Sequence, residues 1–142
     1  MGKLLQRLKD PSRSGVYRVA RVDEVLDATR EGSPRVSRVS LAGALDRTEL
    51  LARVARSLQF PDWFGANWDA LEDCLTDLSW LEADGHVLLL EDASGLTPDD
   101  FGVFADILSS SAQYWAGRAR PFFAVFVQGP PSLPALIREK SA

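Results

Sequence analysis

The sequence has few of the residues that hold small secreted or metal-binding domains together. Its 142 residues include one cysteine, Cys74, which excludes an internal disulfide and a cysteine-based zinc site. The longest wholly apolar run, at 122–127, is far shorter than the roughly 20 residues that span a bilayer. The first ten residues lack the apolar region of a secretory signal. We therefore expect a cytoplasmic protein with no membrane partner.

Basic residues are missing from a long internal stretch. The net charge of −4 comes from 16 Lys and Arg against 20 Asp and Glu. Residues 57–117 hold twelve of these acids and no base, whereas residues 1–56 hold 12 bases and 7 acids. An acidic surface of this kind repels nucleic acid, so its natural partner is a basic protein surface or a cation. A solvated surface that serves only solubility is the other interpretation.

Signatures of common enzymes are also absent. The sequence has no GxSxG, Walker A, HExxH or GxGxxG motif. The one histidine, His86, opens an apolar run and is more typical of a structural residue than of a base. Cys74 falls on the apolar side of a predicted helix, where a thiol is not reactive. We expect no enzyme activity and no cofactor. A cation held by Asp69, Glu72 and Asp73 keeps a metal-dependent enzyme as the weaker alternative.

Apolar runs alternate with amphipathic segments, which predicts an α/β fold. Strands are expected at 15–20, 36–41, 86–91 and 122–127, and helices begin near 22, 46, 67 and 97. This order predicts a small parallel sheet with helices packed against it. Residues 4–14 are polar and predict a short arm. Prolines at 130, 131 and 134 predict an irregular end to the chain, with room for one short terminal helix.

The predicted helix that Asn67 caps has one apolar face and one acidic face. The apolar face contains Trp68, Leu71, Cys74, Leu75 and Leu78. The opposite face is centred on Asp69, Asp73 and Thr76, with Glu72 and Asp77 on its flanks. Asp69 and Asp73 are four residues apart, where like charges repel. A helix selected only for stability would place a lysine at one of these positions, so we interpret the acidic face as a functional surface.

Three aromatic residues lie in the turn just before this helix. Phe60 and Phe64 are expected to close the edge of the core. Trp63, beside Asp62, is the better candidate for exposure, because tryptophan is enriched at the energetic centres of protein interfaces.

The run FPDWFGANWDALEDCLTDL at 60–78 resembles the signature of the barstar family, intracellular inhibitors of the ribonuclease barnase. That pattern is a proline, an acid, two aromatics, Gly, any residue, Asn, an apolar residue, Asp-Ala-Leu, one residue and Asp-Cys-Leu-Thr. The order of elements over about 36–128 is also similar. The resemblance implies a barstar-like domain over 36–142, with a three-stranded parallel sheet packed with helices. Residues 1–35 have no counterpart and form an N-terminal extension, which either extends the interface or lengthens the sheet at one edge.

The resemblance also implies a function for the acidic helix and its loop. They would plug the active site of a ribonuclease or similar basic toxin, with Asp73 in the phosphate site. Asp69 would be a second contact to basic residues, and Trp63 an aromatic contact from the loop. Gly65 and Asn67 would shape the loop and cap the helix. The flanking residues complete the expected partner-binding set, namely Asp62, Glu72, Thr76 and Asp77.

Two residues depart from the family pattern. Glu72 stands where barstar has a tryptophan, and Leu78 where it has an aromatic just beyond the helix. Both positions face the partner in barstar, so the target of this chain is left open. The alternative function is a scaffold that binds a partner through the same acidic face without inhibiting it.

Overall fold

The apolar runs of the sequence form the strands of one parallel sheet. The computed structural model describes residues 2–137 and contains β1 (Gly15–Val19), β2 (Arg35–Ser40), β3 (His86–Glu91) and β4 (Phe122–Val127). Their order in the sheet is β1-β4-β3-β2, and every neighbouring pair is parallel. The two central strands, β3 and β4, are buried along nearly their whole length, as continuous apolar runs require. The predicted parallel α/β sheet is confirmed.

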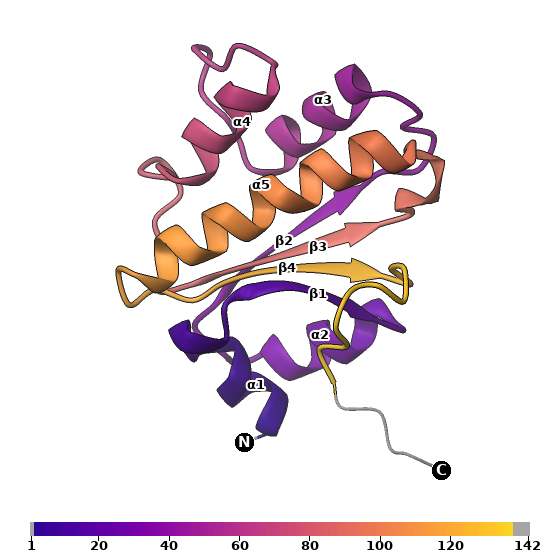
Figure 1. Cartoon of the computed structure of the whole chain (residues 1–142). Coiled ribbons are helices and arrows are strands. Elements are labelled where there is room, and N and C mark those ends of the chain that lie inside the picture. The colour runs from indigo at the N-terminus through magenta and orange to yellow at the C-terminus, as the bar shows by residue number, and fades with distance from the viewer. Residues whose placement is uncertain (1, 138–142) are drawn as a thin grey trace.

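Helices cover both faces of this sheet (Figure 1). On one face lie α3 (Arg47–Ser57), α4 (Trp68–Leu75) and α5 (Pro98–Ala116), and on the other lie α1 (Lys3–Leu8) and α2 (Val22–Thr29). Short 3-10 turns occur at η1 (Pro11–Arg13) and η2 (Ala93–Gly95). The helices on the first face start at the predicted caps, since Asp46, Asn67 and Thr97 each accept a hydrogen bond from a backbone N–H of the first turn.

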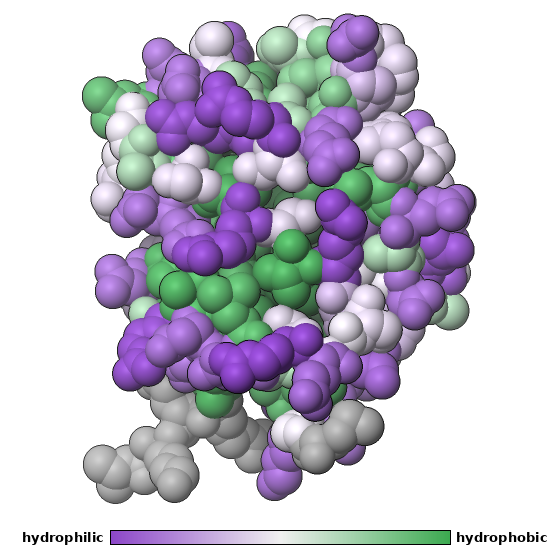
Figure 2. Space-filling model, turned by 180° about the vertical axis from the view of Figure 1, so that it is seen from behind, coloured by the Kyte–Doolittle hydropathy of each residue, from purple (hydrophilic) through white to green (hydrophobic). Residues whose placement is uncertain are grey.

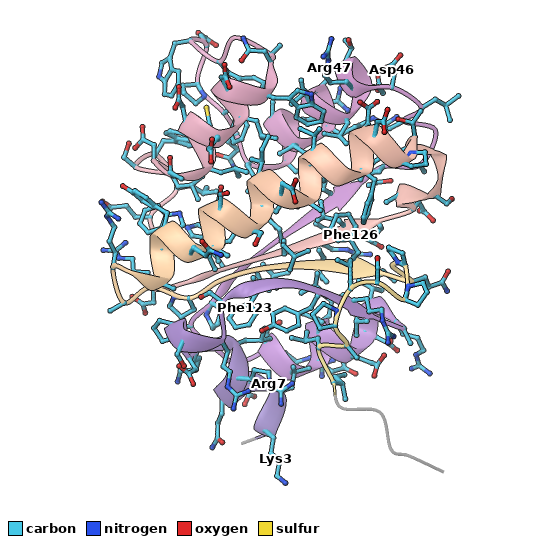
Figure 3. All side chains as sticks on the ribbon, in the orientation of Figure 1. Lys3, Arg7, Asp46, Arg47, Phe123 and Phe126 are labelled. Carbon is cyan, nitrogen blue, oxygen red and sulfur yellow. The ribbon has the colours of Figure 1, made fainter. Side chains whose placement is uncertain are left out.

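Side chains of β4 alternate between two hydrophobic cores. Phe126 points toward α5 and Phe123 toward α1 and α2 (Figure 3), and both are fully buried. The core on the α3–α5 side is the larger of the two and includes the buried face of α4. The second core joins α1, α2 and the segment after β4. The acidic helix therefore rests on the larger core.

The N-terminal residues differ from the sequence prediction. The polar arm expected at 4–14 contains α1, because Leu5 and Leu8 are spaced to bury on one side of a helix, 8% and 0% exposed, and Leu8 belongs to the second core. The extension also lengthens the sheet at one edge, since β1 pairs with β4 from Gly15↔Phe123 to Val19↔Val127. The sheet consequently has four strands in place of the three that the family resemblance implied.

Two helix boundaries also differ from prediction. The helix expected over 67–78 ends at Leu75, and Leu78 has a positive φ of 50° that a helix cannot contain. The terminal helix is not found in the described residues after β4, where Ala135 instead forms a bridge with Arg18 of β1. Residues 138–142 lie outside the described part of the chain.

The edge strand β2 presents charge to solvent. Arg35 and Arg38 are exposed, and Arg38 forms a two-bonded ion pair with Glu91, with both N–O distances 2.9 Å. Charged side chains on an edge strand oppose pairing with another sheet. Seen from behind, the molecule shows hydrophilic groups around smaller hydrophobic areas (Figure 2). Among the described residues, no helix is both long and apolar enough to cross a membrane.

Candidate functional site

The acidic helix α4 begins at a complete side-chain cap. The Asn67 Oδ1 atom accepts a hydrogen bond from the Ala70 N–H at 2.7 Å, and Asn67 Nδ2 donates to the Gly65 carbonyl at 3.4 Å. One side chain thus satisfies a free N–H of the first turn and also holds the loop that precedes it. The predicted capping role of Asn67 is confirmed.

The inner face of α4 is fixed against α5. Leu71, Cys74 and Leu75 are each 0% exposed, as the helical spacing predicts. The Trp115 indole N–H, from α5, donates to the Leu75 carbonyl at 2.8 Å. This bond satisfies a carbonyl in the last turn, where helices leave their acceptors unpaired. The helix is therefore held at both ends, by its own cap and by its neighbour.

The outer face of α4 carries carboxylates that face solvent. Asp69 and Asp73 are exposed, as predicted, and so is Asp62 in the preceding loop, while Glu72 is half-buried. Among residues 2–137, none of these four forms an ion pair with a basic side chain. Because nothing in the described chain neutralises them, their field extends outward from α4.

Because α4 is shorter than predicted, two of the expected site residues lie beyond its last residue. The half-buried Thr76 hydroxyl donates to the Glu72 carbonyl at 2.8 Å, so it serves the helix end. Asp77 is exposed but lies beyond the helix, and its Oδ1 accepts from the Ser79 N–H at 3.2 Å. The acidic face of α4 itself therefore ends at Asp73.

An aromatic cluster supports the loop before α4. Phe60 and Phe64 are partly buried on the larger core and meet edge to face at 4.9 Å between ring centroids. Trp63 is 58% exposed, and its ring meets Trp80 edge to face at 6.0 Å. Trp80 also contacts Phe60 and donates its indole N–H to the Leu58 carbonyl at 3.0 Å. The expected exposure of Trp63 is confirmed.

Trp80 is the residue that sequence reasoning missed. It lies between α4 and β3, in a segment without helical or strand periodicity, so no local pattern marked it. The one signal available in the sequence was a tryptophan that follows closely after the acidic helix. Its ring, held by the bond to the Leu58 carbonyl, supports the exposed ring of Trp63.

The turn between Phe64 and Asn67 depends on an alanine in a strained conformation. Ala66 has φ of +52°, in the left-handed region that favours glycine. Gly65 does not have a positive φ, and a Cβ there would meet Asn67 Nδ2 at 3.4 Å, an ordinary contact. The positive-φ position of this loop is therefore one residue later than the glycine that the family pattern singles out.

The two departures from the family pattern have different surroundings. Leu78 is only 3% exposed and belongs to the larger core, so it cannot contact a partner as the aligned aromatic does in barstar. The position of the barstar aromatic is therefore part of the hydrophobic core in this chain. Glu72 is half-buried on the flank of α4 and keeps access to solvent.

The residues weighed for enzyme chemistry are poorly placed for it. Burial, with Asp77 and Asp73 nearby, raises the pKa of the Cys74 thiol to about 11, so the thiolate is scarce at neutral pH. In the described part of the chain, no group of three or more His, Cys, Asp or Glu side chains is arranged to hold a metal ion. The cation site weighed for Asp69, Glu72 and Asp73 therefore has no structural support.

One pocket shares no residue with this face. It has a volume of about 600 Å³ and opens where β3 and β4 end, between Glu91 and Gln128. No predicted site residue lines it, and neither does a Lys, Arg or His among the described residues. It therefore adds no basic or catalytic group to the acidic helix.

Comparison with known proteins decides the family. The family model described as Barstar (barnase inhibitor) matches residues 35–127, which is more than half of the chain. The chain belongs to the barstar family. This match includes every predicted partner-binding residue and the strands β2, β3 and β4. It leaves α1, β1 and α2 outside the barstar region.

Solved structures add a likeness of fold. The crystal structure of Cdc6p from Pyrobaculum aerophilum matches this barstar-family chain with a TM-score of 0.56 and 18% sequence identity. The match covers 87% of this chain and 38% of that one, so the likeness concerns a part of Cdc6p and the fold alone. No curated protein matches the sequence.

Proposed function

We propose that this chain inhibits a ribonuclease of the barnase type, or a similar basic toxin, by placing α4 and the preceding loop in its active site. The observation that carries the proposal is the pair of exposed carboxylates, Asp69 and Asp73, which have no cationic partner in residues 2–137. They lie within a stretch, 57–117, that has twelve acids and no base. The family match supports this assignment.

The way in which α4 would block a ribonuclease follows from what the active site of that enzyme must bind. Its active site attracts the phosphate backbone through cationic side chains. The Asp73 carboxylate, on the outer face of α4, occupies that phosphate position, and Asp69 one turn earlier pairs with a second cation. Charge-assisted hydrogen bonds of this kind are stronger than neutral ones, and strongest where water is excluded.

The rigidity of α4 adds to its affinity for the proposed partner. The Asn67 cap and the Trp115 bond hold both ends of the helix before any partner arrives. A site that is already ordered loses less conformational entropy on binding. Trp63, supported by Trp80, packs beside the charged centre and excludes water from its edge. Asp62 and Glu72 add charge around this contact.

The inhibitor role needs no chemistry from the chain itself. In this proposal the protein has no enzyme activity and no cofactor, because binding alone blocks the partner. A cytoplasmic location fits the role, since a free buried thiol such as Cys74 is typical of a reducing compartment.

The test is inhibition of purified barnase-type ribonucleases, barnase among them, in an RNA-cleavage assay. We expect inhibition of at least one enzyme and a loss of several kcal/mol of binding free energy for Asp73→Ala, because its cationic partners would stay buried and unpaired. Asp106→Ala, an exposed acid on α5, is the matched control and should bind like the parent. If folded Asp73→Ala inhibits as well as the parent, α4 is not the interface.

The scaffold alternative keeps one observation in its favour. Leu78 is buried and Glu72 is an acid, so the aromatic contacts that barstar has at these two positions are missing from this face. A scaffold would bind its partner in a way that depends on Asp73 while RNA cleavage continues unchanged. Measuring binding and cleavage on the same samples separates the two functions.

A further inference from the structure

The pocket of about 600 Å³ lies at the carboxyl ends of the two central strands. The chain leaves β3 at Asp92 and runs to α5 on one face of the sheet. It leaves β4 at Gln128 and runs to β1, where Ala135 forms a bridge with Arg18, and Leu136 then enters the core on the other face (Figure 1). Neighbouring parallel strands whose chains part to opposite faces leave a crevice, which is where open α/β sheets bind ligands.

Apolar side chains supply much of the lining of this pocket. The branch toward α5 contributes Leu96 and Phe101, the end of β4 contributes Val127, and the branch after β4 contributes Pro130. Leu96 is 9% exposed, and the Phe101 ring lies 5.0 Å from the buried ring of Phe126, so this wall is anchored in the larger core. The volume is in the range of small-molecule sites, and such a wall suits a flat aromatic group.

The charged lining of the pocket is acidic. Glu91 and Asp92 contribute carboxylates, and none of the described Lys, Arg or His residues lines it. The Glu91 carboxylate is already occupied by Arg38, through two hydrogen bonds of 2.9 Å. The Asp92 carboxylate is exposed, has no ion pair among residues 2–137 and does not cap the 3-10 turn that follows it. Asp92 therefore keeps its charge available for a ligand.

The start of α5 does not reverse this preference for a cation. Pro98, in the first turn of α5, lines the pocket, and the positive end of a helix dipole attracts anions. Asp99 and Asp100 lie in the same turn, however, and their carboxylates oppose that attraction. The field at the pocket therefore favours a cation over an anion.

Both strand ends place a strained residue in the lining of the pocket. Asp92 has φ of 61° and Gln128 has φ of 55°, in the left-handed region that favours glycine. Each residue directly follows its strand, where the chain turns away from the sheet. Strained backbone of this kind is concentrated at ligand-binding sites. Its presence on both sides of one crevice supports a binding role for this end of the sheet.

We propose that this pocket binds a small aromatic amine in its ammonium form. The ammonium group pairs with the Asp92 carboxylate, and the aromatic ring packs against Leu96, Phe101 and Val127. Each part of the ligand is matched by a part of the lining, the charge by an unpaired acid and the ring by apolar side chains. The proposal does not depend on inhibition by α4, since no residue of that face lines the pocket.

Three indole derivatives of similar size but different charge test the proposal. Tryptamine is the cation, indole-3-ethanol the neutral molecule and indole-3-acetate the anion. Each is titrated into the full chain at pH 7, and binding is followed by the backbone amide signals of Ser94, Leu96 and Gly129 in ¹H–¹⁵N spectra. We expect tryptamine to bind saturably with a Kd of about 1 mM or tighter, as is usual for a ligand of this size. Indole-3-ethanol, indole-3-acetate and ethylamine, which lacks the ring, should each bind at least tenfold more weakly.

A charge-removing variant separates a built site from general attraction to an acidic protein. Asp92→Asn should remain folded, because asparagine tolerates the left-handed backbone as aspartate does. It should bind tryptamine at least tenfold more weakly and indole-3-ethanol as the parent does. Asp106→Asn, an exposed acid of α5 outside the pocket, is the matched control and should bind tryptamine like the parent.

Three results would overturn the proposal. The first is that tryptamine shifts none of these amide signals saturably. The second is that indole-3-acetate or ethylamine binds as tightly as tryptamine, which would remove the role of the charge or of the ring. The third is that Asp92→Asn binds tryptamine like Asp106→Asn.

Discussion

The indole N–H of Trp115 donates a hydrogen bond to the Leu75 carbonyl oxygen at 2.8 Å, which joins the end of α5 to the last turn of the acidic helix. These residues are forty positions apart in the sequence, so only the packed fold brings them together. The bond satisfies a helix-end acceptor and fixes the direction in which α4 presents Asp69 and Asp73. Trp115 also lines a pocket of about 440 Å³ beside the end of α4.

Replacing Trp115 with phenylalanine tests that support. We expect Trp115→Phe to lower the free energy of unfolding by about 1–3 kcal/mol in urea titrations, because the Leu75 carbonyl loses its partner in a partly buried place. Trp63→Phe is the matched control, since Trp63 is 58% exposed and should change stability by less than about 0.5 kcal/mol. Equal stabilities of the two variants would show that the bond contributes nothing.

The cap of α4 gives a second prediction. Asn67→Ala should cost about 1 kcal/mol of stability, because the Ala70 N–H loses its acceptor. Asn67→Asp should retain most of the parent stability, since aspartate caps as well as asparagine does. Thermal unfolding followed by circular dichroism measures both. An aspartate variant as unstable as the alanine variant would mean that the cap does not account for the loss.

The two faces of α4 should differ in how much truncation destabilises the protein. Leu71→Ala, at a site with no exposure, should lower stability by about 2–5 kcal/mol. Asp69→Ala should change stability by less than about 0.5 kcal/mol, because relief of its repulsion from Asp73 is offset by loss of a favourable acid in the first turn of α4. Urea unfolding of both variants is the measurement. A marked loss of stability in Asp69→Ala would mean that this carboxylate is structural.

Stability should depend on pH through His86. Burial, with Arg35 and Arg120 nearby, lowers its pKa in the folded chain to about 4, while the unfolded side chain titrates near 6.5. Between these values the unfolded chain binds the extra proton, so the free energy of unfolding falls as pH falls from about 6.5 toward 4. His86→Phe should flatten this dependence between pH 5 and 6.5, above the usual range of carboxylates. An unchanged slope in this variant would contradict the role of His86.

Association with a basic partner should depend on salt. The excess of acids over 57–117 steers a cationic protein toward α4, so the association rate should fall as salt rises. Exposed charges are screened beyond about 8 Å at physiological ionic strength, and the dissociation rate should change less. Stopped-flow mixing at several salt concentrations measures both rates. An association rate that is independent of salt would exclude electrostatic steering.

Local patterns predicted the elements well because their causes are local. Asp46, Asn67 and Thr97 begin helices with their own side chains, and the runs at 86–91 and 122–127 are apolar enough to be buried on both faces. The exposure of Asp69 and Asp73 also followed from helical spacing. The predicted arm was wrong because its helix is stabilised by burial that no local pattern shows, with Leu8 packed among residues of β1, α2, β3 and β4.

The sequence by itself determined the strands, the capped helices, the acidic face of α4 and the barstar resemblance, since each depends on residues close together in the chain. Only the tertiary structure decided that β1 joins β4, that Leu78 is a core residue, and that Trp80 and Trp115 hold the loop and the helix. It also brought His86, Arg118 and Arg120 to one pocket. These contacts join segments far apart in sequence, and burial and hydrogen bonding select them only when the whole core assembles.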